Sequence, residues 1–544
     1  MSYKQKIQSE IKKAVNDFAD EIIVEKPKSK DHGDAATNIA MVLAKSEKRN
    51  PIDIANEIKE KIKLNPALIS KIEVAKPGFL NFTVSDQALA ESLLEVFKSE
   101  GTYGFAQKNL KEKILVEYVS ANPTGDLHIG HGRQAVIGSC LVNLLDKAGN
   151  NLSSEFYIND HGEQIAKLSE TTWAIYEKLN GKEIVWLENF YPEEGILPYV
   201  EKCRGEVTSP LQIGEMVKDL ILKSQKELLC SCNVEFDKWF SETDLHRNKS
   251  VEDTLNKLKQ SGSCYENEGA VWFKAKEFGD VRDRVLIRAD KRPTYLIADI
   301  SYHIDKLKRG FDKLITVWGA DHHGQEISLK GGLKALGYDT NKLEIIFVQL
   351  VSLKQQGQEV KMSKRAGTVI TVREVLTEVG VDAFRYFLIE THQNNRMVFD
   401  IDLAKKQDKD NPVYYIQYAH ARCCSIFRQY KELNVKEKFD FDNLALLMNS
   451  FKAKDQEYTT TKDLILKVLD FPEEVILAAK SRSPNRIANY LKDLATDFHQ
   501  FYTVCRVITN DSNLTKSRLI LVEAVKITIA NGLKILGISA PETM

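Results

Sequence analysis

The stretch that decides the fold runs from Ile114 to Gly132 and reads ILVEYVSANPTGDLHIGHG. Its first residues are mostly apolar and rich in β-forming side chains, which is typical of a strand buried in a parallel sheet. A polar loop follows, and a helical pattern then continues from about His128 to a stop at Gly149. A strand, a loop and a helix start, in this order, form the place where open α/β sheets bind their ligands.

Strand and helix patterns alternate along the rest of this region. The further β-type runs are SSEFYIND (153–160), VLIRAD (285–290), TYLIADISYHIDKLKRG (294–310), LITVWGAD (314–321) and EIIFVQLVSL (344–353). The alternation predicts an α/β fold with a Rossmann-like, doubly wound parallel sheet, in a domain that covers residues 109–405. Residues from about 170 to 285 fit the alternation poorly, and we expect them to form an insertion between the two halves of the sheet.

Two further domains are expected, one on each side. Residues 1–108 combine helical segments with the strand-like run KIEVAKPGFLNFTVS around a Pro-Gly turn, which predicts a small α+β domain. Within it, Asn50 and Pro51 form a helix start signal, a capping residue followed by proline. Residues 406–544 carry apolar side chains at three-to-four spacing and no strand pattern, which predicts an all-α bundle.

Composition places few limits on the partners of this chain. Its 544 residues carry a net charge of -1, so no global basic field indicates nucleic acid, although acidic surface can balance a local basic groove. The eight cysteines form no CxxC pair, so we expect no zinc and no other resident metal. The charged start is unlike a signal peptide, and no run approaches the roughly 20 apolar residues that span a bilayer. We therefore expect a soluble cytoplasmic protein with no membrane partner.

The loop and helix start carry groups suited to a nucleotide. Backbone N–H groups and the positive end of the helix dipole point at an anion there. His128 and His131 are three residues apart, share a helix face and can both donate to phosphate oxygens. Gly130 and Gly132 leave room for an adenine ring against the backbone. Taken alone, the pattern fits equally well a structural turn with one solvated and one buried histidine.

A lysine-rich segment about 230 residues downstream favours the nucleotide over the structural turn. It follows the run EIIFVQLVSL and a turn that contains glycine, and reads Val360-Lys361-Met362-Ser363-Lys364-Arg365-Ala366-Gly367. Two lysines on a short loop can close over a triphosphate and meet the charge of departing pyrophosphate, although a lysine-rich loop alone is usually only solvated surface. In this order and strand context, the two segments resemble the HIGH and KMSKS elements of class I aminoacyl-tRNA synthetases.

Longer strings extend the resemblance over essentially the whole chain. They resemble arginyl-tRNA synthetases at EYVSANPTG (117–125), YIND (157–160), WGADHHG (318–324), NPVYYIQYAHAR (411–422) and GFLNF (78–82). The resemblance implies a ligase that uses ATP and Mg²⁺ to join L-arginine to tRNA(Arg), acting as a monomer. The amino-terminal domain would touch the tRNA, the central domain would be catalytic, and the bundle would bind the anticodon.

The resemblance also implies roles for particular residues. The catalytic residues would be His128, His131, Lys361 and Lys364. The ATP site would contain Asn122, Pro123, Thr124, Gly125, Leu127, His128, Gly130, His131, Asp321, His322, Lys361, Met362, Ser363 and Lys364. Arginine would meet Glu117, Asn122, Tyr295 and Asp299, whose carboxylates and planar acceptors suit the five guanidinium donors. The tRNA contacts would be Asn81, Tyr414 and Tyr418.

Several of these residues have plainer interpretations from the sequence alone. Asp299 fits a surface helix acid as well as a ligand, and Tyr295 fits a core aromatic. Tyrosines at helical spacing, such as Tyr414 and Tyr418, are more often core than base-stacking platforms. Asn81, following a turn, is also an ordinary turn-forming residue.

Three other classes of protein remain as alternatives to an arginyl enzyme. Another class I synthetase would bring zinc ligands or a large editing insertion, and the sequence has neither the spacing nor the room. A small-molecule nucleotidyltransferase would not need a KMSK segment joined to a large helical bundle. A non-catalytic tRNA-binding paralogue would not need both histidines and both lysines.

Overall fold

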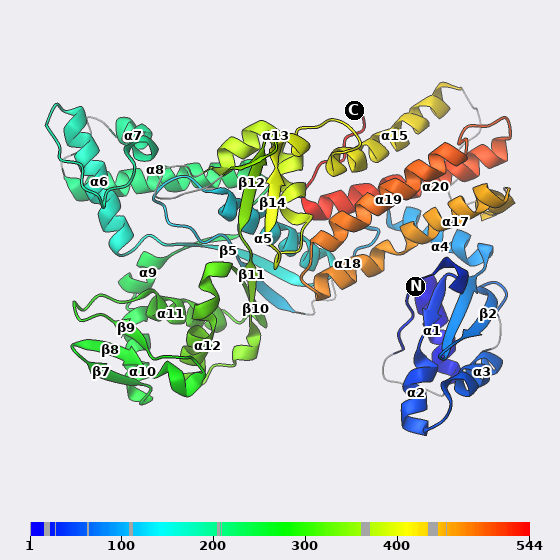
Figure 1. Ribbon diagram of the computed structural model, residues 1–544, viewed down its shortest axis with the longest axis horizontal. Helices are drawn as coiled ribbons and strands as arrows, with labels where there is room; N and C mark the ends of the chain where they lie inside the picture. The colour runs from blue at the N-terminus through cyan, green and yellow to red at the C-terminus, as the bar shows by residue number, and fades with distance from the viewer. Residues whose placement is uncertain are drawn as a thin grey trace.

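Five parallel strands form the sheet at the centre of the computed structural model (Figure 1). The structure describes residues 2–15, 22–27, 29–62, 65–107, 112–203, 207, 209–360, 370–433, 444–452 and 454–544. The strand order is β11-β10-β4-β5-β6, with bounds Leu343–Val348, Lys313–Gly319, Lys113–Glu117, Asn151–Ile158 and Lys238–Ser241. The predicted doubly wound parallel sheet is therefore confirmed.

Alternating side chains of these strands face two separate helical layers. On β4, Ile114 and Val116 point into the core formed with α5 (Ile129–Lys147) and α13 (Val372–Ile389). Leu115, between them, points into a second core formed with α11 (Tyr295–Lys308) and α12 (Glu326–Ala335). The period-2 alternation places helices on both faces and leaves the carboxyl edge of the sheet for the loops.

The run at 294–310 is a helix and not the strand that its β-branched content suggested. Helix α11 buries Ile297, Ile300 and Ile304, which recur at spacings of three and four residues. This periodicity places them on one helix face against the sheet. The density of isoleucine in the run was misleading, and the spacing was the better guide.

The stretch from about 170 to 285 is not a single insertion. Helices α6 (Glu163–Leu179), α7 (Glu193–Lys202) and α8 (Pro210–Ser231) pack around a core of their own. The chain then returns to the main sheet as β6, whose residues pair in parallel with β5. Helices α9 (Glu242–Arg247) and α10 (Ser250–Gln260) follow, with a small antiparallel sheet of β7 (Cys264–Asn267), β8 (Ala270–Phe273) and β9 (Arg284–Ile287).

The amino-terminal domain packs its helices on an antiparallel sheet with the order β1-β3-β2. The strands are Ala35–Thr37, Phe79–Val84 and Ile69–Ala75, and the helices α1–α4 are Tyr3–Ala14, Ile39–Glu47, Pro51–Lys61 and Asp86–Ser99. The predicted start of α3 is confirmed, because the Asn50 side chain accepts from the backbone N–H of Ile52 at 2.9 Å.

Asn81 lies in the middle strand β3 and not in a loop. It pairs with Ala36 on one side and Glu73 on the other, and is only 6% exposed. Its side chain is therefore largely buried in the free protein, and the tRNA contact expected of Asn81 stays a prediction.

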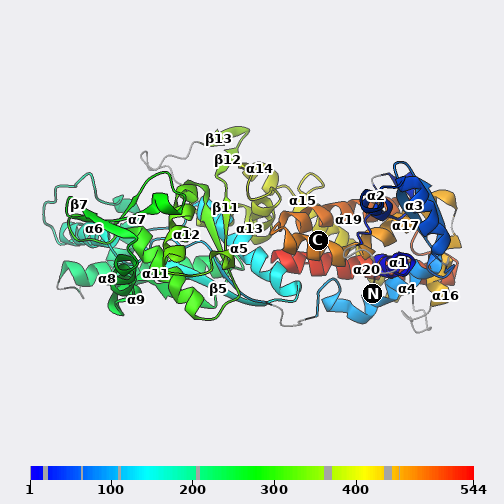
Figure 2. The same cartoon turned by 90° about the horizontal axis from the view of Figure 1, so that it is seen from below.

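The carboxy-terminal region is the predicted all-α bundle, and the molecule is elongated along the axis that joins it to the sheet domain (Figures 1 and 2). Its helices α15–α20 are Pro412–Glu432, Leu444–Asn449, Asp455–Leu469, Phe471–Lys480, Asn485–Val504 and Ser512–Leu536. Between the bundle and the sheet lie β12 (Val351–Gln355), β13 (Gln358–Val360), β14 (Met397–Asp400) and α14 (Ile401–Ala404). Among the described residues, no helix combines the length and apolar character needed to cross a membrane.

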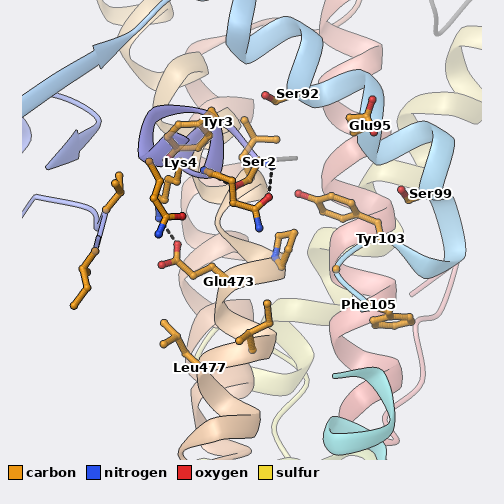
Figure 3. A pocket seen from close by; sticks show the side chains of 18 of the residues that line it. Ser2, Tyr3, Lys4, Ser92, Glu95, Ser99, Tyr103, Phe105, Glu473 and Leu477 are labelled. Atoms are coloured by element: carbon orange, nitrogen blue, oxygen red, sulfur yellow. Dashed lines mark hydrogen bonds and ion pairs between the residues drawn. The ribbon is translucent and has the colours of Figure 1, made fainter. Parts of the chain in front are cut away.

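The amino-terminal domain contacts the bundle around a cavity of about 530 Å³, shown in Figure 3. At its rim, Lys4 on α1 pairs with Glu473 at 2.5 Å and with Asp470 at 2.8 Å, both near the start of α18. The Tyr103 hydroxyl donates to the backbone carbonyl of Val468 at 2.9 Å. These contacts fix one terminal domain on the other, and the cavity lies between them, away from the carboxyl edge of the sheet.

Candidate active site

The HIGH segment comprises residues 128–131, and its two histidines lie at the start of α5. His128 is the capping residue, and its Nδ1 accepts from the backbone N–H of His131 at 3.3 Å. The two imidazole rings stack, with centroids 3.7 Å apart and planes 17° apart. Both rings therefore lie at the positive end of the helix dipole, where an anion such as phosphate is favoured.

The loop before α5 is held in a conformation that side chains rarely adopt. Val119 and Ser120 have φ values of 73° and 48°, and a β-branched residue in this region is a genuine outlier. Gln225 on α8 secures the next part of the loop, donating to the backbone carbonyls of Asn122 and Gly125 at 3.1 and 2.8 Å. The Asn122 amide itself donates to Gln164 at 3.0 Å. Backbone strain that the surrounding contacts hold in place is characteristic of ligand sites.

Lys361, Met362, Ser363 and Lys364 lie outside the described residues. The chain that follows them is anchored directly to the HIGH segment. The backbone N–H of Ile129 donates to the carbonyl of Ile370 at 3.2 Å, and that of Val372 donates to Leu127 at 2.8 Å. The fold therefore brings Ile370 and Val372, which follow the KMSK segment (361–364) in the chain, to the start of α5, although the two regions are far apart in sequence.

Gly130 of the HIGH segment and Gly132, directly after it, serve close packing within the protein. A β-carbon on Gly132 would lie 2.9 Å from Val372 and 3.0 Å from Phe384, both on α13. A β-carbon on Gly130 would lie 2.9 Å from the His128 ring. The prediction that Gly132 leaves room for adenine is wrong, because α13 occupies that side of the helix.

Glu117, at the end of β4, is the centre of a buried polar network. Its carboxylate pairs with Lys306 on α11, a lysine that is only 1% exposed. It also accepts from Ser120 Oγ at 2.8 Å and from Thr316 Oγ1 at 3.3 Å. Glu117 is thus held rigidly, with much of its hydrogen-bonding capacity occupied by the protein.

Asp299 and Tyr295 lie one helical turn apart on α11, the helix that also carries Lys306. Burial raises the pKa of Asp299 to about 8, with further contributions from Glu117 and Glu242 that exceed the opposing effect of Lys306. A carboxyl group with such a pKa is suited to meet a cation that stabilises its charge. Tyr295 is 54% exposed and lines a cavity of about 190 Å³ beside it, so the interpretation of Tyr295 as a core aromatic is excluded.

Asp321 and His322 follow β10 in a short 3-10 helix, Ala320–Gln325. Both are solvent-accessible, and His322 Nδ1 lies 3.1 Å from Gln325 Oε1. Gly319 permits this turn, since a β-carbon there would lie 2.6 Å from Asp321 Oδ1 and 3.3 Å from Gln134 on α5. The turn therefore lies beside the HIGH helix at the carboxyl edge of the sheet.

Three family models match successive parts of the chain. They are the arginyl tRNA synthetase N terminal domain at residues 1–84, the class I (R) tRNA synthetase catalytic domain at 92–420, and the DALR anticodon binding domain at 416–544. Arginine–tRNA ligases from Staphylococcus epidermidis and Halalkalibacterium halodurans are 41% and 42% identical to this chain, each covering 99% of it and 98% and 99% of the relative. The chain belongs to the arginine–tRNA ligase family.

A solved structure shares the fold of this family member. The Thermus thermophilus arginyl-tRNA synthetase superposes with a TM-score of 0.78 at 22% identity, over 99% of this chain and all of the other. At this identity the likeness concerns the fold: the parallel sheet, the helical bundle and the amino-terminal domain occur together in both.

The match to an anticodon binding domain begins at residue 416, so on α15 it includes Tyr418 and begins after Tyr414. Tyr414 and Tyr418 have nearly parallel rings, 9° apart with centroids separated by 6.4 Å. Tyr418 is 36% exposed, and the Arg422 guanidinium lies 4.6 Å from its ring and 4.6 Å from that of Tyr502. These residues form an aromatic and basic surface rather than core.

Sequence reasoning missed several charged groups near the predicted arginine ligands. Lys306 on α11, His161 after β5, and Glu242 and His246 on α9 carry no motif and come from three different parts of the chain. Glu242 begins α9 directly after β6, and its side chain is buried at the same carboxyl edge of the sheet. Only the spacing of Asp299 and Lys306, which share one face of α11, offered a signal in the sequence.

Proposed function

We propose that this chain activates L-arginine with ATP and transfers it to tRNA(Arg). The observation that carries the proposal is the division of the site into two ends. The anion end is His128 and His131 at the start of α5, and the acid end is Glu117, Asp299 and Glu242. A triphosphate suits the first and a guanidinium suits the second.

In the first step an arginine carboxylate oxygen attacks the α-phosphorus of ATP, and the bond to the bridging oxygen of pyrophosphate breaks. No protein nucleophile is needed, because catalysis consists of positioning and of stabilising negative charge. His128 and His131 donate to the phosphates. Lys361 and Lys364, assigned from the sequence, meet the charge of the departing pyrophosphate.

The substrates are held by the remaining predicted residues. Arginine contacts Asp299, Tyr295 and Asn122, while Glu117 orients the wall of the pocket through Lys306. Asp321 and His322 contact the nucleotide from the turn after β10. Mg²⁺ enters with ATP, held largely by phosphate and water oxygens.

In the second step a terminal ribose hydroxyl of tRNA, by class the 2′-OH, attacks the arginyl carbonyl carbon, and AMP leaves. The amino-terminal domain (residues 1–108) and the bundle (406–544), which contact each other, hold the tRNA next to the catalytic domain (109–405). Tyr414 and Tyr418 stack on unpaired anticodon bases. The Arg422 guanidinium, which lies over the Tyr418 ring, attracts the negatively charged tRNA backbone. We propose that the enzyme works as a cytoplasmic monomer.

Charging of bulk tRNA with each amino acid tests the assignment. Arginine alone is expected to support aminoacylation, and ATP–pyrophosphate exchange is expected only when tRNA is present. Charging with lysine or another amino acid would overturn the substrate. The absence of charging with any amino acid, in protein that melts cooperatively, would favour a non-catalytic tRNA-binding role.

A further inference from the structure

Three potential metal ligands meet beside the predicted arginine pocket. His161 follows β5, while Glu242 and His246 lie four residues apart on α9. One ligand atom from each lies within 4.8 Å of the others, and His246 Nε2 is 3.7 Å from Glu242 Oε1. His161 and Glu242 also line the cavity of about 190 Å³ that reaches Tyr295, so a small ion has a path to the cluster.

Two buried polar atoms in this cluster have no hydrogen-bond partner among the described residues. They are Glu242 Oε2, on a residue that is 5% exposed, and His246 Nε2. A buried polar atom left in this state costs about 1–3 kcal/mol. A cation held between these atoms would satisfy both at once.

Carboxylates near the cluster favour a cation. Asp160, the residue before His161, adds a nearby carboxylate. The two arginines that line the same cavity, Arg288 and Arg292, each lie 3.6 Å from Glu163, and Arg292 also pairs with Asp290 at 2.7 Å, so two carboxylates offset their charge.

We propose that His161, Glu242 and His246 form a site for one divalent transition-metal ion such as Zn²⁺. Two imidazoles and one carboxylate make up a ligand set that zinc uses when it keeps one position open for water. Imidazole ligands favour such metals over Mg²⁺ and Ca²⁺, which prefer oxygen. The absence of CxxC pairs therefore does not exclude zinc from this chain, contrary to the expectation from its cysteines.

Binding requires a small rearrangement of the imidazoles. The rings of His161 and His246 stack face to face, with centroids 3.7 Å apart and planes 14° apart. Since each nitrogen lone pair lies in the plane of its ring, one ring must rotate before both point at one ion. Ligand nitrogens and oxygens lie about 2.0–2.2 Å from zinc, so the cluster must also contract slightly.

A metal ion here would oppose arginine binding. Glu242 is close enough to Asp299 and Tyr295 to affect the pKa of each. A divalent ion beside these groups repels the guanidinium and competes for the carboxylates it needs. By linkage, arginine must weaken metal binding by the same factor. This antagonism rests on the proposed arginine pocket, whereas metal binding itself does not.

Cobalt provides a direct test, because Co²⁺ in zinc sites absorbs visible light. Chelator-treated full-length protein carrying Cys230→Ser, which removes an exposed thiol, is titrated with Co²⁺ and then with Zn²⁺. We expect one Co²⁺ per chain, displaced by Zn²⁺. His246→Asn and His161→Asn should each weaken the affinity at least tenfold, since losing even an outer-shell partner of a metal costs that much.

His32→Asn is the matched control, because His32 is an exposed histidine of the amino-terminal domain. It should leave the Co²⁺ spectrum and affinity unchanged. Equal affinity in the control and in both cluster variants would overturn the metal site. A metal affinity that saturating arginine leaves unchanged would overturn the antagonism, whatever the outcome of the charging assay.

Discussion

Two stacked pairs of histidines lie at the carboxyl edge of one sheet, and their surroundings are opposite. The rings of His128 and His131 have centroids 3.7 Å apart and planes 17° apart, and those of His161 and His246 have centroids 3.7 Å apart and planes 14° apart. The first pair lies at the positive end of α5. The second lies beside the buried carboxylate of Glu242. The electrostatic surroundings, and not the residue type, therefore decide which ligand each pair suits.

The predicted active site as a whole shows the same contrast between an anion end and an acid end. The anion end depends on the His128 and His131 imidazoles, on backbone N–H groups and on a helix dipole. The acid end depends on carboxylates whose charge must be stabilised by a buried lysine or by a ligand. Substitutions at the two ends should therefore have separable consequences for stability, for catalysis and for pH dependence.

The largest effect is expected from Lys306→Ala at the acid end. The substitution leaves the Glu117 carboxylate buried without its cation, which typically costs about 3–5 kcal/mol of unfolding free energy. Urea unfolding of the variant should show this loss. Lys308→Ala, on the exposed side of the same helix, is the control and should change stability little. Equal losses in the two variants would contradict the role of the Glu117–Lys306 pair.

At the anion end, His128→Asn isolates the imidazole from the helix cap. Asparagine retains an acceptor for the start of α5, so the helix should remain intact. Loss of a donor to the reacting phosphates should lower ATP–pyrophosphate exchange with tRNA on the order of a hundredfold. Arginine affinity, measured by equilibrium binding, should stay unchanged. A parallel loss of arginine affinity would show that the two ends are not independent.

The strand, loop and helix start that hold the anion end could be predicted well, because their information is local. The strand at 114–117, the loop and the HIGH helix are contiguous, so periodicity and capping rules apply to them directly. Asn122 and the start of α5, together with Glu117 of the acid end, could therefore be placed at the carboxyl end of a strand by pattern alone. Gly132 was misinterpreted because its neighbours Val372 and Phe384 come from a distant helix.

The acid end could be predicted only in part. Tyr295 and Asp299 were assigned by resemblance, although the run that holds them looked like a strand. Lys306 and Glu242 lie on separate elements and meet their partners only through tertiary packing. The place of Asn81 in a middle strand could not be seen locally for a related reason, since β1 and β2 pair on either side of β3 only in the folded domain.

The smallest predicted effect is a pH dependence that only the acid end should show. The pKa of Asp299 is raised to about 8 by burial first and by Glu117 and Glu242 next. Below that value the carboxyl group is mostly protonated in the empty pocket, and a guanidinium must displace the proton. Arginine affinity should therefore rise about fivefold between pH 7 and pH 8, as a single titrating group requires.

The same shift has a consequence for stability with a definite sign. The unfolded chain ionises Asp299 near the ordinary value of 3.8, whereas the folded enzyme keeps the proton up to about 8. The unfolded state thus binds fewer protons across this window, and the Asp299 contribution to folding stability falls as pH rises. Bound arginine opposes that loss, because it stabilises the ionised carboxylate.

Asp299→Asn distinguishes this group from its neighbours. The variant should bind arginine weakly, and its arginine affinity should not change between pH 7 and pH 8. The wild-type enzyme holds ATP at the anion end, so its ATP affinity should also stay constant over this range. Calorimetric titration at two pH values measures both affinities. A slope that survives in Asp299→Asn would assign the proton to another group, and a matching slope for ATP would mean that the two ends titrate together.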